Sequence, residues 1–226
     1  MMPAEPGGDP CGRAVDPIVD ATLSGDENVE LPELDDPPDD PLALLRAWLD
    51  GAVERGVREP GAMVLATVDG DGHPASRTVL LKSLDGRGLL LTTDAGSAKG
   101  RHLAAVPWAS TTFYWRETLQ QVNLAGPVER VTEAEADTLF AERPTSAQIA
   151  TAVSRQSEPL DDEQALYARA LELRDRGAPV QRPAEWWGYR IVPEWVEFWH
   201  GRADRLHRRL VYSRDAPGWV PRRLQP

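Results

Sequence analysis

A ribbon between Ala75 and Thr93, with an aliphatic centre from Val79 to Leu91, constrains the fold of this chain more than any other stretch. It predicts a strand over Ala75–Leu84, a tight turn at Asp85-Gly86 and a second strand over Gly88–Thr93. Between Val79 and Leu91 most residues outside the turn are aliphatic, as in strands that are buried on both faces or closed into a barrel. The ribbon therefore indicates a protein organised around a sheet.

Polar groups interrupt this ribbon and follow its end. They are Arg77, Lys82, Thr92, Thr93, Ser97 and Lys99. Cations, hydroxyls and a Gly-Ser turn that opens a helix suit a dianionic phosphate, because charged donors and backbone N–H groups converge there. An ordinary hairpin with solvated charges at its ends would show the same pattern, since nothing here has the specificity of a P-loop.

The remaining strands are expected in hairpin-linked pairs separated by short helices. We expect strands at Ala62–Val68, Trp108–Trp115, Leu119–Val131, Trp186–Val192, Trp195–His200 and Arg205–Ser213. We expect helices from Pro41 towards Gly56, over Gly96–Val106, from Thr132 towards Glu142, and over Ser146–Ser154 and Asp161–Arg176. This order predicts a mainly β fold, a largely antiparallel barrel with peripheral helices, rather than a doubly wound sheet.

The first expected helix has a clear start signal and one apolar face. Asp40 is expected as its N-cap, followed by Pro41 at the first helical position. Apolar residues such as Leu45, Trp48 and Ala52 recur at helical spacing after it, which predicts a helix that packs on the sheet through one side.

The acidic residues are concentrated at the start of the chain. Residues 1–40 hold 12 of the 36 Asp and Glu residues but only 1 of the 25 Lys and Arg residues, so they account for the formal net charge of -11. We expect residues 1–38 to be a largely disordered acidic segment, with Leu31–Leu34 able to lie on the body, and a folded domain over residues 39–226. The balanced charge of that domain predicts no nucleic-acid partner.

Cysteine usage and hydropathy limit the possible cellular location and the possible metal and membrane partners. The lone Cys11 excludes an internal disulfide and a Cys-based metal site. No apolar run approaches the length of a membrane span, and the start of the chain lacks a signal-peptide pattern. We therefore expect a cytoplasmic protein with no membrane partner. No metal site is expected either, because His73, His102 and His200 lack partners that would suggest ligation.

Several short motifs occur together in one order along the chain. They are Arg77–Lys82, Thr92–Arg101, Gln120-Gln121, Ser154–Ser157, Glu197–Gly201, Arg205–Arg209 and Arg222–Pro226. From about Pro41 to Pro226 the chain thereby resembles the pyridoxamine 5′-phosphate oxidase family. The resemblance implies an FMN-binding split β-barrel, a homodimer with FMN at the subunit interface, and oxidase activity with O2 as electron acceptor.

Longer segments resemble one branch of that family, the flavin oxidases of phenazine biosynthesis. They are Asp39–Leu42, Val106–Ser110, Tyr114–Gln121, Val153–Glu158 and Gly218–Pro226. This closer resemblance implies that the substrate is a small aromatic carboxylate, a reduced tricyclic phenazine precursor, and not phosphorylated pyridoxine or pyridoxamine.

The resemblance also assigns the cofactor contacts. The residues expected to contact FMN are Arg77, Thr78, Val79, Leu80, Leu81, Lys82, Thr92, Thr93, Ser97, Lys99, Gln121, Gln156, Ser157, Trp199 and Arg209. Ala98 stands where the family usually has Arg, and losing that contact would cost about 1.5–3 kcal/mol at most. For Trp199, a purely structural role as a core aromatic residue is the alternative.

The expected substrate site departs further from that of pyridoxamine 5′-phosphate oxidase itself, the vitamin enzyme of the family. There the substrate phosphate is held by Lys, Tyr, Arg and Ser, and the matching residues here are Lys82, Leu139, Arg143 and Ala147. Two missing hydrogen bonds at about 1.5–3 kcal/mol each would lower the affinity for a phosphate ester by roughly two to four decades. A carboxylated molecule that is flatter than a phosphorylated pyridoxine suits the two remaining contacts, Lys82 and Arg143.

Arg205 and His207 match family residues that contact the substrate over the flavin, and they are the expected catalytic residues. On a strand beginning at Arg205, the side chains of Arg205, His207 and Arg209 would point the same way. A solvated strand face is the alternative for this basic run.

The sequence thus predicts an FMN-dependent oxidase that dehydrogenates a reduced phenazine carboxylate. A pyridoxamine or pyridoxine 5′-phosphate oxidase that tolerates Leu139 and Ala147 is the alternative within enzymes. A split-barrel protein that carries flavin, deazaflavin or haem without turnover is an alternative from another class. A third possibility is a protein that functions through its acidic segment, and only the amino-acid composition supports it.

Overall fold

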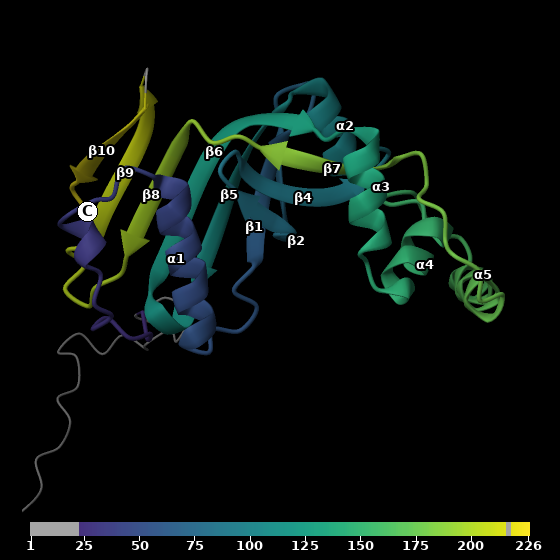
Figure 1. The fold of residues 1–226 in the computed structure, drawn as a ribbon, viewed down its shortest axis with the longest axis horizontal. Coiled ribbons are helices and arrows are strands. Elements are labelled where there is room, and N and C mark those ends of the chain that lie inside the picture. The colour runs from purple at the N-terminus through teal and green to yellow at the C-terminus, as the bar shows by residue number, and fades with distance from the viewer. Residues whose placement is uncertain (1–22, 216–217) are drawn as a thin grey trace, which may run out of the picture.

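The protein is described by a computed structural model that covers residues 23–215 and 218–226 (Figure 1). The strands are β1 (Ala62–Val68), β2 (Pro74–Leu80), β3 (Ser83–Asp85), β4 (Gly88–Asp94), β5 (Trp108–Trp115), β6 (Gln120–Arg130), β7 (Trp186–Ile191), β8 (Trp195–His200), β9 (Arg208–Asp215) and β10 (Gly218–Leu224). The helices are η1 (Pro32–Leu34), α1 (Pro41–Glu54), α2 (Ala98–Ala105), η2 (Arg116–Thr118), α3 (Glu133–Ala141), α4 (Thr145–Val153) and α5 (Glu163–Asp175). None of the helices in these residues is long and apolar enough to cross a membrane.

One antiparallel sheet dominates the structure, which confirms the predicted mainly β fold. Its main path runs β10-β9-β8-β6-β5-β1-β2, while β3, β4 and β7 pair off this path. The long strand β6 connects the two parts, because Gln120–Ala125 pair with β8 and Val128–Arg130 pair with β7. Between these halves lies Gly126, where a Cβ would come within 2.0 Å of the Val192 carbonyl oxygen. Only glycine allows this close approach, which lets the sheet curl.

Helix α1 lies across the sheet (Figure 1), and its buried residues, among them Leu45, Trp48 and Ala52, belong to the main core cluster. Asp40 caps it as predicted, since its carboxylate accepts a hydrogen bond from the Leu42 N–H at 2.8 Å. Trp48 is buried on its inner face and packs edge-on against Phe198 of β8, with ring centroids 5.0 Å apart. Such aromatic pairs stabilise a core beyond the area that they bury.

The stretch before α1 lies on the body of the protein. Leu31 and Leu34 are buried in the main core, and the Tyr212 hydroxyl donates to the Pro38 carbonyl at 2.8 Å. The expected short contact of Leu31–Leu34 with the body is therefore confirmed. Cys11 and the rest of residues 1–22 lie outside the described residues.

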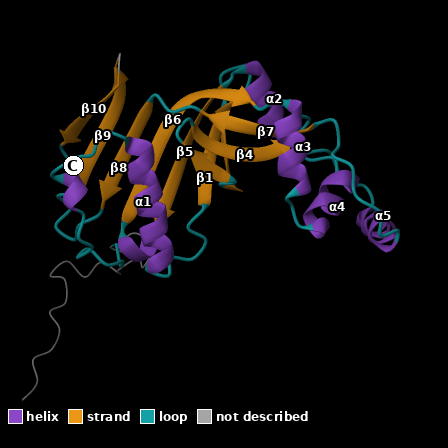
Figure 2. Cartoon of the chain, viewed as in Figure 1, coloured by secondary structure: helices purple, strands orange, loops and turns teal. Residues whose placement is uncertain are grey.

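Helices α3, α4 and α5 gather at one end of the sheet (Figure 2). Helix α3 packs on β7 through a second core cluster that includes Leu139, Phe140 and Trp186. Helix α5 packs mainly on α4 and buries none of its residues. The helix expected over Asp161–Arg176 is thus present, but its apolar stripe is only half-buried.

The predicted ribbon is wrong in two details. The strand expected over Ala75–Leu84 ends at Leu80, because the Leu81 N–H bonds to Gly61 while the Lys82 N–H bonds to Leu90. The backbone changes partner there, from β1 to β4. Moreover, β2 is the edge strand of the main path and alternates between exposed and half-buried residues, whereas burial on both faces was expected.

The C-terminal strands also differ from the prediction. The strand expected at Arg205–Ser213 begins at Arg208, since Arg205 has a φ of 62° that no strand accommodates. The residues from Gly218 to Leu224 form a strand, β10, that was not expected. Pro221 lies within it, and proline is tolerated there because β10 ends the sheet.

Candidate functional site

The turn between β4 and α2 brings hydroxyls and a cation together. Ser97 caps α2, accepting a hydrogen bond from the Gly100 N–H at 3.2 Å and donating to the Asp94 carbonyl at 2.7 Å. The buried Thr93 hydroxyl lies 3.3 Å from the Ser97 hydroxyl. Lys99, on the first turn of α2, places its ammonium 3.5 Å from the same oxygen. Three residues named from the ribbon thus meet at one helix start.

A distant segment after α4 joins this turn. The Gln156 side-chain oxygen accepts hydrogen bonds from Lys99 Nζ at 3.2 Å and from the Thr93 hydroxyl at 3.3 Å. The Ser157 hydroxyl accepts from the Ala98 N–H at 3.1 Å. The resemblance had assigned Gln156 and Ser157 to the cofactor, and the structure brings both to the polar turn.

Arg77 reaches the same region from β2. Its guanidinium donates to the Thr67 hydroxyl at 2.6 Å and to the Leu65 carbonyl at 3.3 Å. Burial lowers the pKa of Arg77. Burial, followed by the positive charge of Arg77, lowers the pKa of Lys99, and Asp94 offsets this in part. The structure therefore holds two desolvated cations near one another.

We call these residues the cation cluster. It comprises Arg77, Thr93, Ser97, Lys99, Gln156 and Ser157. Within the described part of the chain, neither Arg77 nor Lys99 forms an ion pair. Desolvated cations without a counter-charge are costly unless an anion binds between them. The donor set, hydroxyls, ammonium, guanidinium and backbone N–H groups, fits a phosphate.

A second set of expected cofactor residues lies in a row across three strands. Gln121 of β6 faces Trp199 of β8, and Trp199 faces Arg209 of β9. We call these three residues the strand row. The buried carboxylate of Glu197 accepts from Arg209 Nε at 2.6 Å and so fixes the guanidinium. Sequence reasoning missed Glu197, although it stands two residues before Trp199 and therefore on the same strand face.

The cation cluster and the strand row lie on opposite faces of the sheet. Arg77 is the cross-strand partner of Leu65, which is fully buried on the core side. Gln121 is the partner of Tyr114, whose side chain is exposed on the other side. Cross-strand partners share a face. The two sets of one chain therefore cannot contact a single ligand.

The other residues of the predicted FMN contact lie along the ribbon. Thr78, Val79 and Leu80 belong to the edge strand β2, and Leu80 is 67% exposed. Leu81 and Lys82 lie where the backbone changes partner, and Thr92 lies on β4 opposite Gly188. The exposure of Leu80 shows that β2, the strand that carries Arg77, is accessible to solvent.

His207 and Arg205 lie on the loop before β9 and not on the strand. The expected common face of Arg205, His207 and Arg209 is therefore wrong. His207 nevertheless stacks beside Trp199 of the strand row, with ring centroids 4.7 Å apart. Arg205 is exposed, and its guanidinium makes no hydrogen bond or ion pair to another described residue.

Lys82 and Arg143, the expected substrate contacts, lie next to an acid that sequence reasoning missed. Lys82 Nζ is 3.2 Å from a Glu142 carboxylate oxygen. Arg143 donates to the Thr151 hydroxyl at 2.9 Å and lies over the Trp186 ring at 5.0 Å. Its pKa is lowered by burial. This corner is thus cationic, aromatic and partly neutralised by Glu142.

Leu139 and Ala147, which replace polar family residues, lie near this corner. Leu139 is buried in the second core cluster, and Ala147 is half-buried on α4. Neither side chain has a group that can hydrogen-bond to a phosphate. We therefore still expect both phosphate contacts to be lost, because neither side chain can replace the polar family residue.

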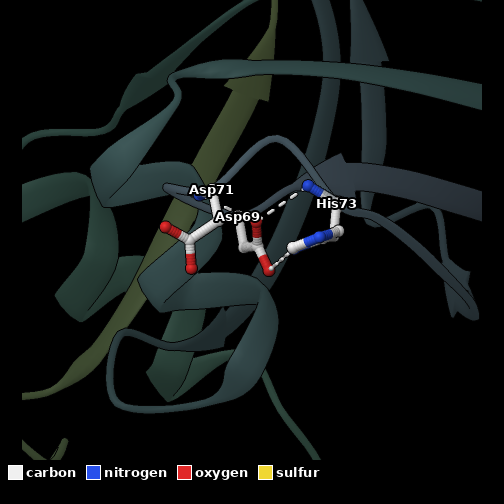
Figure 3. Close-up of side chains that lie close together, drawn as sticks. All are labelled: Asp69, Asp71 and His73. Atoms are coloured by element: carbon white, nitrogen blue, oxygen red, sulfur yellow. Dashed lines mark hydrogen bonds and ion pairs between the residues drawn. The ribbon is translucent and has the colours of Figure 1, made fainter.

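The turn between β1 and β2 gathers Asp69, Asp71 and His73 (Figure 3). The Asp69 carboxylate accepts from the N–H groups of Asp71 and His73 at 3.0 and 2.8 Å and lies 3.4 Å from the His73 ring. These bonds are those of a side-chain-stabilised turn. The cluster therefore has a structural explanation, and we assign no ligand to it.

The surroundings of His102 and His200 are explained by structural roles. His102 Nδ1 lies 3.1 Å from the Thr67 hydroxyl. His200 is buried, and neither of its ring nitrogens has a hydrogen-bond partner among the described residues. Burial lowers the pKa of His200.

A curled antiparallel sheet with this cation cluster defines a protein of the split-barrel class. Residues 49–177 match the family described as pyridoxamine 5′-phosphate oxidase, and residues 186–226 match the pyridoxine 5′-phosphate oxidase C-terminal dimerisation region. The chain belongs to the pyridoxamine 5′-phosphate oxidase family.

Individual relatives carry names from two activities. A pyridoxine/pyridoxamine 5′-phosphate oxidase of Rubrobacter xylanophilus is 47% identical, over 83% of this chain and 87% of that protein. A dihydrophenazinedicarboxylate synthase of Pseudomonas chlororaphis is 44% identical, over 91% and 92%. The crystal structure of PhzG from Burkholderia lata 383 in complex with tetrahydrophenazine-1-carboxylic acid has a TM-score of 0.87 and 43% identity, covering 89% of this chain and all of that one.

Proposed function

We propose that this protein is an FMN-dependent oxidase that dehydrogenates a reduced tricyclic phenazine carboxylate, with O2 as electron acceptor. Its relatives include a dihydrophenazinedicarboxylate synthase, and a related solved structure contains a tetrahydrophenazine carboxylic acid. The observation that carries the choice of substrate is the corner of Lys82, where Glu142 pairs with Lys82 and where Leu139 and Ala147 replace polar family residues.

The cation cluster is the proposed site of the FMN phosphate. Arg77 and Lys99 would supply charge, Ser97 and Thr93 hydroxyls, and the start of α2 backbone donors. Hydrogen bonds to charged groups contribute about 1.5–3 kcal/mol each. Gln156 would keep its side-chain oxygen on Lys99 and donate to the ligand through its amide Nε2, because the amide carries both an acceptor and a donor.

A homodimer would complete the site at the subunit interface. The cation cluster and the strand row of one chain face opposite sides, so one ligand contacts both sets only if a second copy supplies one of them. Exposed apolar side chains on the outer side of the sheet support this arrangement. They are Val64, Leu80, Trp108 and Tyr114. Such patches mark interaction surfaces, and residues 186–226 match a dimerisation region.

The substrate corner disfavours a phosphate ester for an electrostatic reason as well. The Glu142 carboxylate beside Lys82 repels a dianionic phosphate more strongly than a monoanionic carboxylate. The guanidinium of Arg143, which lies over the buried Trp186 ring, suits the carboxylate of a flat ring system. These features support a phenazine carboxylate over a phosphorylated pyridoxine.

Within the proposed reaction, bound FMN would supply the two-electron redox chemistry, with O2 as the final electron acceptor. Arg205 or Arg143 would anchor the substrate carboxylate. His207, stacked beside Trp199, would hydrogen-bond to the substrate. The protein's main contribution is orientation, because correct positioning alone lowers a barrier substantially. We assign this machinery to a domain of residues 39–226, with the acidic segment of residues 1–38 preceding it.

The test is a visible spectrum followed by turnover. Purified protein should carry a flavin absorption that a dihydrophenazine carboxylate bleaches under argon and that air restores. Colourless protein that takes up no added FMN would refute the proposal. A flavin reduced by pyridoxine 5′-phosphate at low substrate concentration, but not by the phenazine, would instead establish the vitamin oxidase. The 47% identical relative and the retained Lys82 and Arg143 favour that second candidate.

A further inference from the structure

The loop that carries the expected catalytic residues is held by the segment before α1. The loop runs from Gly201 to His207 and joins β8 to β9. The carboxylate of Glu27 accepts a hydrogen bond from the Ala203 N–H at 2.7 Å. Glu27 is far from this loop in sequence, so the contact is purely tertiary.

The segment that carries Glu27 is itself fixed in place. The Asp26 N–H donates to the Glu117 carbonyl at 2.8 Å. A Cβ on Gly25 would come within 2.1 Å of the Arg116 carbonyl oxygen, so only glycine allows the segment to lie this close to η2. The Gly201 N–H donates to the Leu119 carbonyl at 2.8 Å, which anchors the loop to the same turn.

The peptide group held by Glu27 also closes the turn of the loop. The Arg202 carbonyl and the Ala203 N–H belong to one planar peptide unit. That carbonyl accepts from the Arg205 N–H at 3.1 Å, and Arg205 has the left-handed φ of 62°. A non-glycine residue keeps such a conformation only where its surroundings enforce it. By fixing this peptide, Glu27 stabilises the strained turn that presents Arg205.

The same loop sets the orientation of His207. The Arg202 N–H donates to His207 Nδ1 at 3.1 Å. A backbone N–H can only donate, so Nδ1 must accept, and the proton of the neutral imidazole must lie on Nε2. The ring beside Trp199 therefore offers a hydrogen-bond donor at its free nitrogen. Asp204 supports this arrangement, because its carboxylate accepts from Arg202 Nε at 3.1 Å and from the Leu206 N–H at 2.9 Å.

We propose that Glu27 is a positioning residue of the oxidase. Through the Ala203 N–H it holds the 201–207 loop so that Arg205 and His207 face the substrate, with His207 as a donor through Nε2. The inference rests on the proposed function for the roles of Arg205 and His207. The loop geometry and the ring tautomer can be measured without any substrate.

The experiment compares Glu27→Ala, Glu27→Gln and the control Glu30→Ala in FMN-loaded protein. Glu27→Gln keeps a side-chain oxygen for the Ala203 N–H. Glu30 is an exposed acid of the same segment, and its carboxylate makes no hydrogen bond to the described residues. Turnover of a reduced phenazine carboxylate and the ring-nitrogen NMR signals of 15N-histidine are recorded for each. The chain has 4 histidines, and a His207→Asn sample assigns the signals of His207.

Glu27→Ala should lower kcat/KM by about 10- to 100-fold, the effect of misplacing reacting groups by a fraction of an ångström to about 1 Å. It should retain FMN, and its His207 signals should shift from the Nε2–H tautomer towards a mixture. Glu27→Gln and Glu30→Ala should match the wild type in both measurements.

Wild-type signals and turnover in Glu27→Ala would overturn the inference. An Nδ1–H tautomer of His207 in the wild type would also overturn it, whether or not any variant folds. If the wild type oxidises no phenazine, the proposed function fails, and the His207 signals of Glu27→Ala still decide whether Glu27 positions the loop.

Discussion

Arg77 and Lys99 lie close enough for the positive charge of one to lower the pKa of the other, and neither forms an ion pair with a described residue. Residues from an edge strand and from a helix start thus converge on one point. Proteins seldom desolvate like charges together without an anion to bind. The pair is the clearest sign of the proposed phosphate site.

Removing either cation should weaken FMN binding. Arg77→Ala or Lys99→Ala should each raise the Kd by about 10- to 100-fold, because a hydrogen bond to a charged group contributes about 1.5–3 kcal/mol. Quenching of flavin fluorescence on titration measures this. Arg87→Ala is the control, since Arg87 pairs with the exposed Glu129 on another turn. Unchanged affinity in both cluster variants would place the phosphate elsewhere.

Lys99 should also carry a stability cost in the apo-protein. Burial lowers its pKa below the usual 10.5, so the fold disfavours the charged ammonium at every pH below the lowered value. The cost shrinks as the pH rises from there towards 10.5 and is absent above it. Lys99→Met should therefore raise the apo-protein Tm at pH 7 while weakening FMN binding. Scanning calorimetry at pH 7 and near pH 10 measures the difference, and a lower Tm at pH 7 would contradict the assignment.

Glu142 should select against phosphate esters. Glu142→Gln removes the carboxylate 3.2 Å from Lys82 Nζ. It should raise kcat/KM for pyridoxine 5′-phosphate by about tenfold, since charges near a protein surface interact by about 1–4 kcal/mol at 4 Å. Steady-state kinetics on both substrates measure the ratio. Glu129→Gln is the matched control, and an equal gain there would point to a general charge effect.

Arg205 should matter for turnover and not for the cofactor. Arg205→Ala should keep its flavin and lose at least about tenfold in kcat/KM, the cost of one hydrogen bond to a charged group. The flavin spectrum and stopped-flow reduction measure the two effects separately. Loss of the flavin, or unchanged turnover, would contradict the substrate role of Arg205.

The outer side of the sheet should form the subunit interface. Leu80→Asp introduces a charge on the edge strand and should convert the dimer to monomers that release FMN. Sedimentation velocity measures the state of association. Leu160→Asp is the control, because Leu160 is 58% exposed, comparable to Leu80 at 67%, but lies ahead of α5. Dimers that persist in Leu80→Asp would move the interface to another surface.

Local signals in the sequence predicted the elements with local causes. Strands β1 and β8 have the expected bounds, and Asp40 caps α1 as expected, because hydrophobic alternation and helix caps act over a few residues. The motif at the start of α2 likewise predicted the hydroxyls and the ammonium of the cation cluster.

Contacts between distant segments could not be read from those patterns. Arg205–His207 were expected on a strand, but they lie in the loop from Gly201 to His207, which is hydrogen-bonded to Glu27 and Leu119, both remote in sequence. Glu142 was missed for the same reason, because only folding brings it to Lys82. The exposure of β2 was unexpected because an aliphatic strand at the edge of one chain looks, in sequence, like a strand in the core.

The opposite placement of the cation cluster and the strand row has a genetic consequence. In the proposed dimer, each site combines the cluster of one chain with the row of the other. A chain damaged at Lys99 and a chain damaged at Arg209 would each be inactive alone. Paired in one hybrid dimer, they would concentrate both lesions in one site and leave its twin intact, so mixing two dead proteins should revive catalysis.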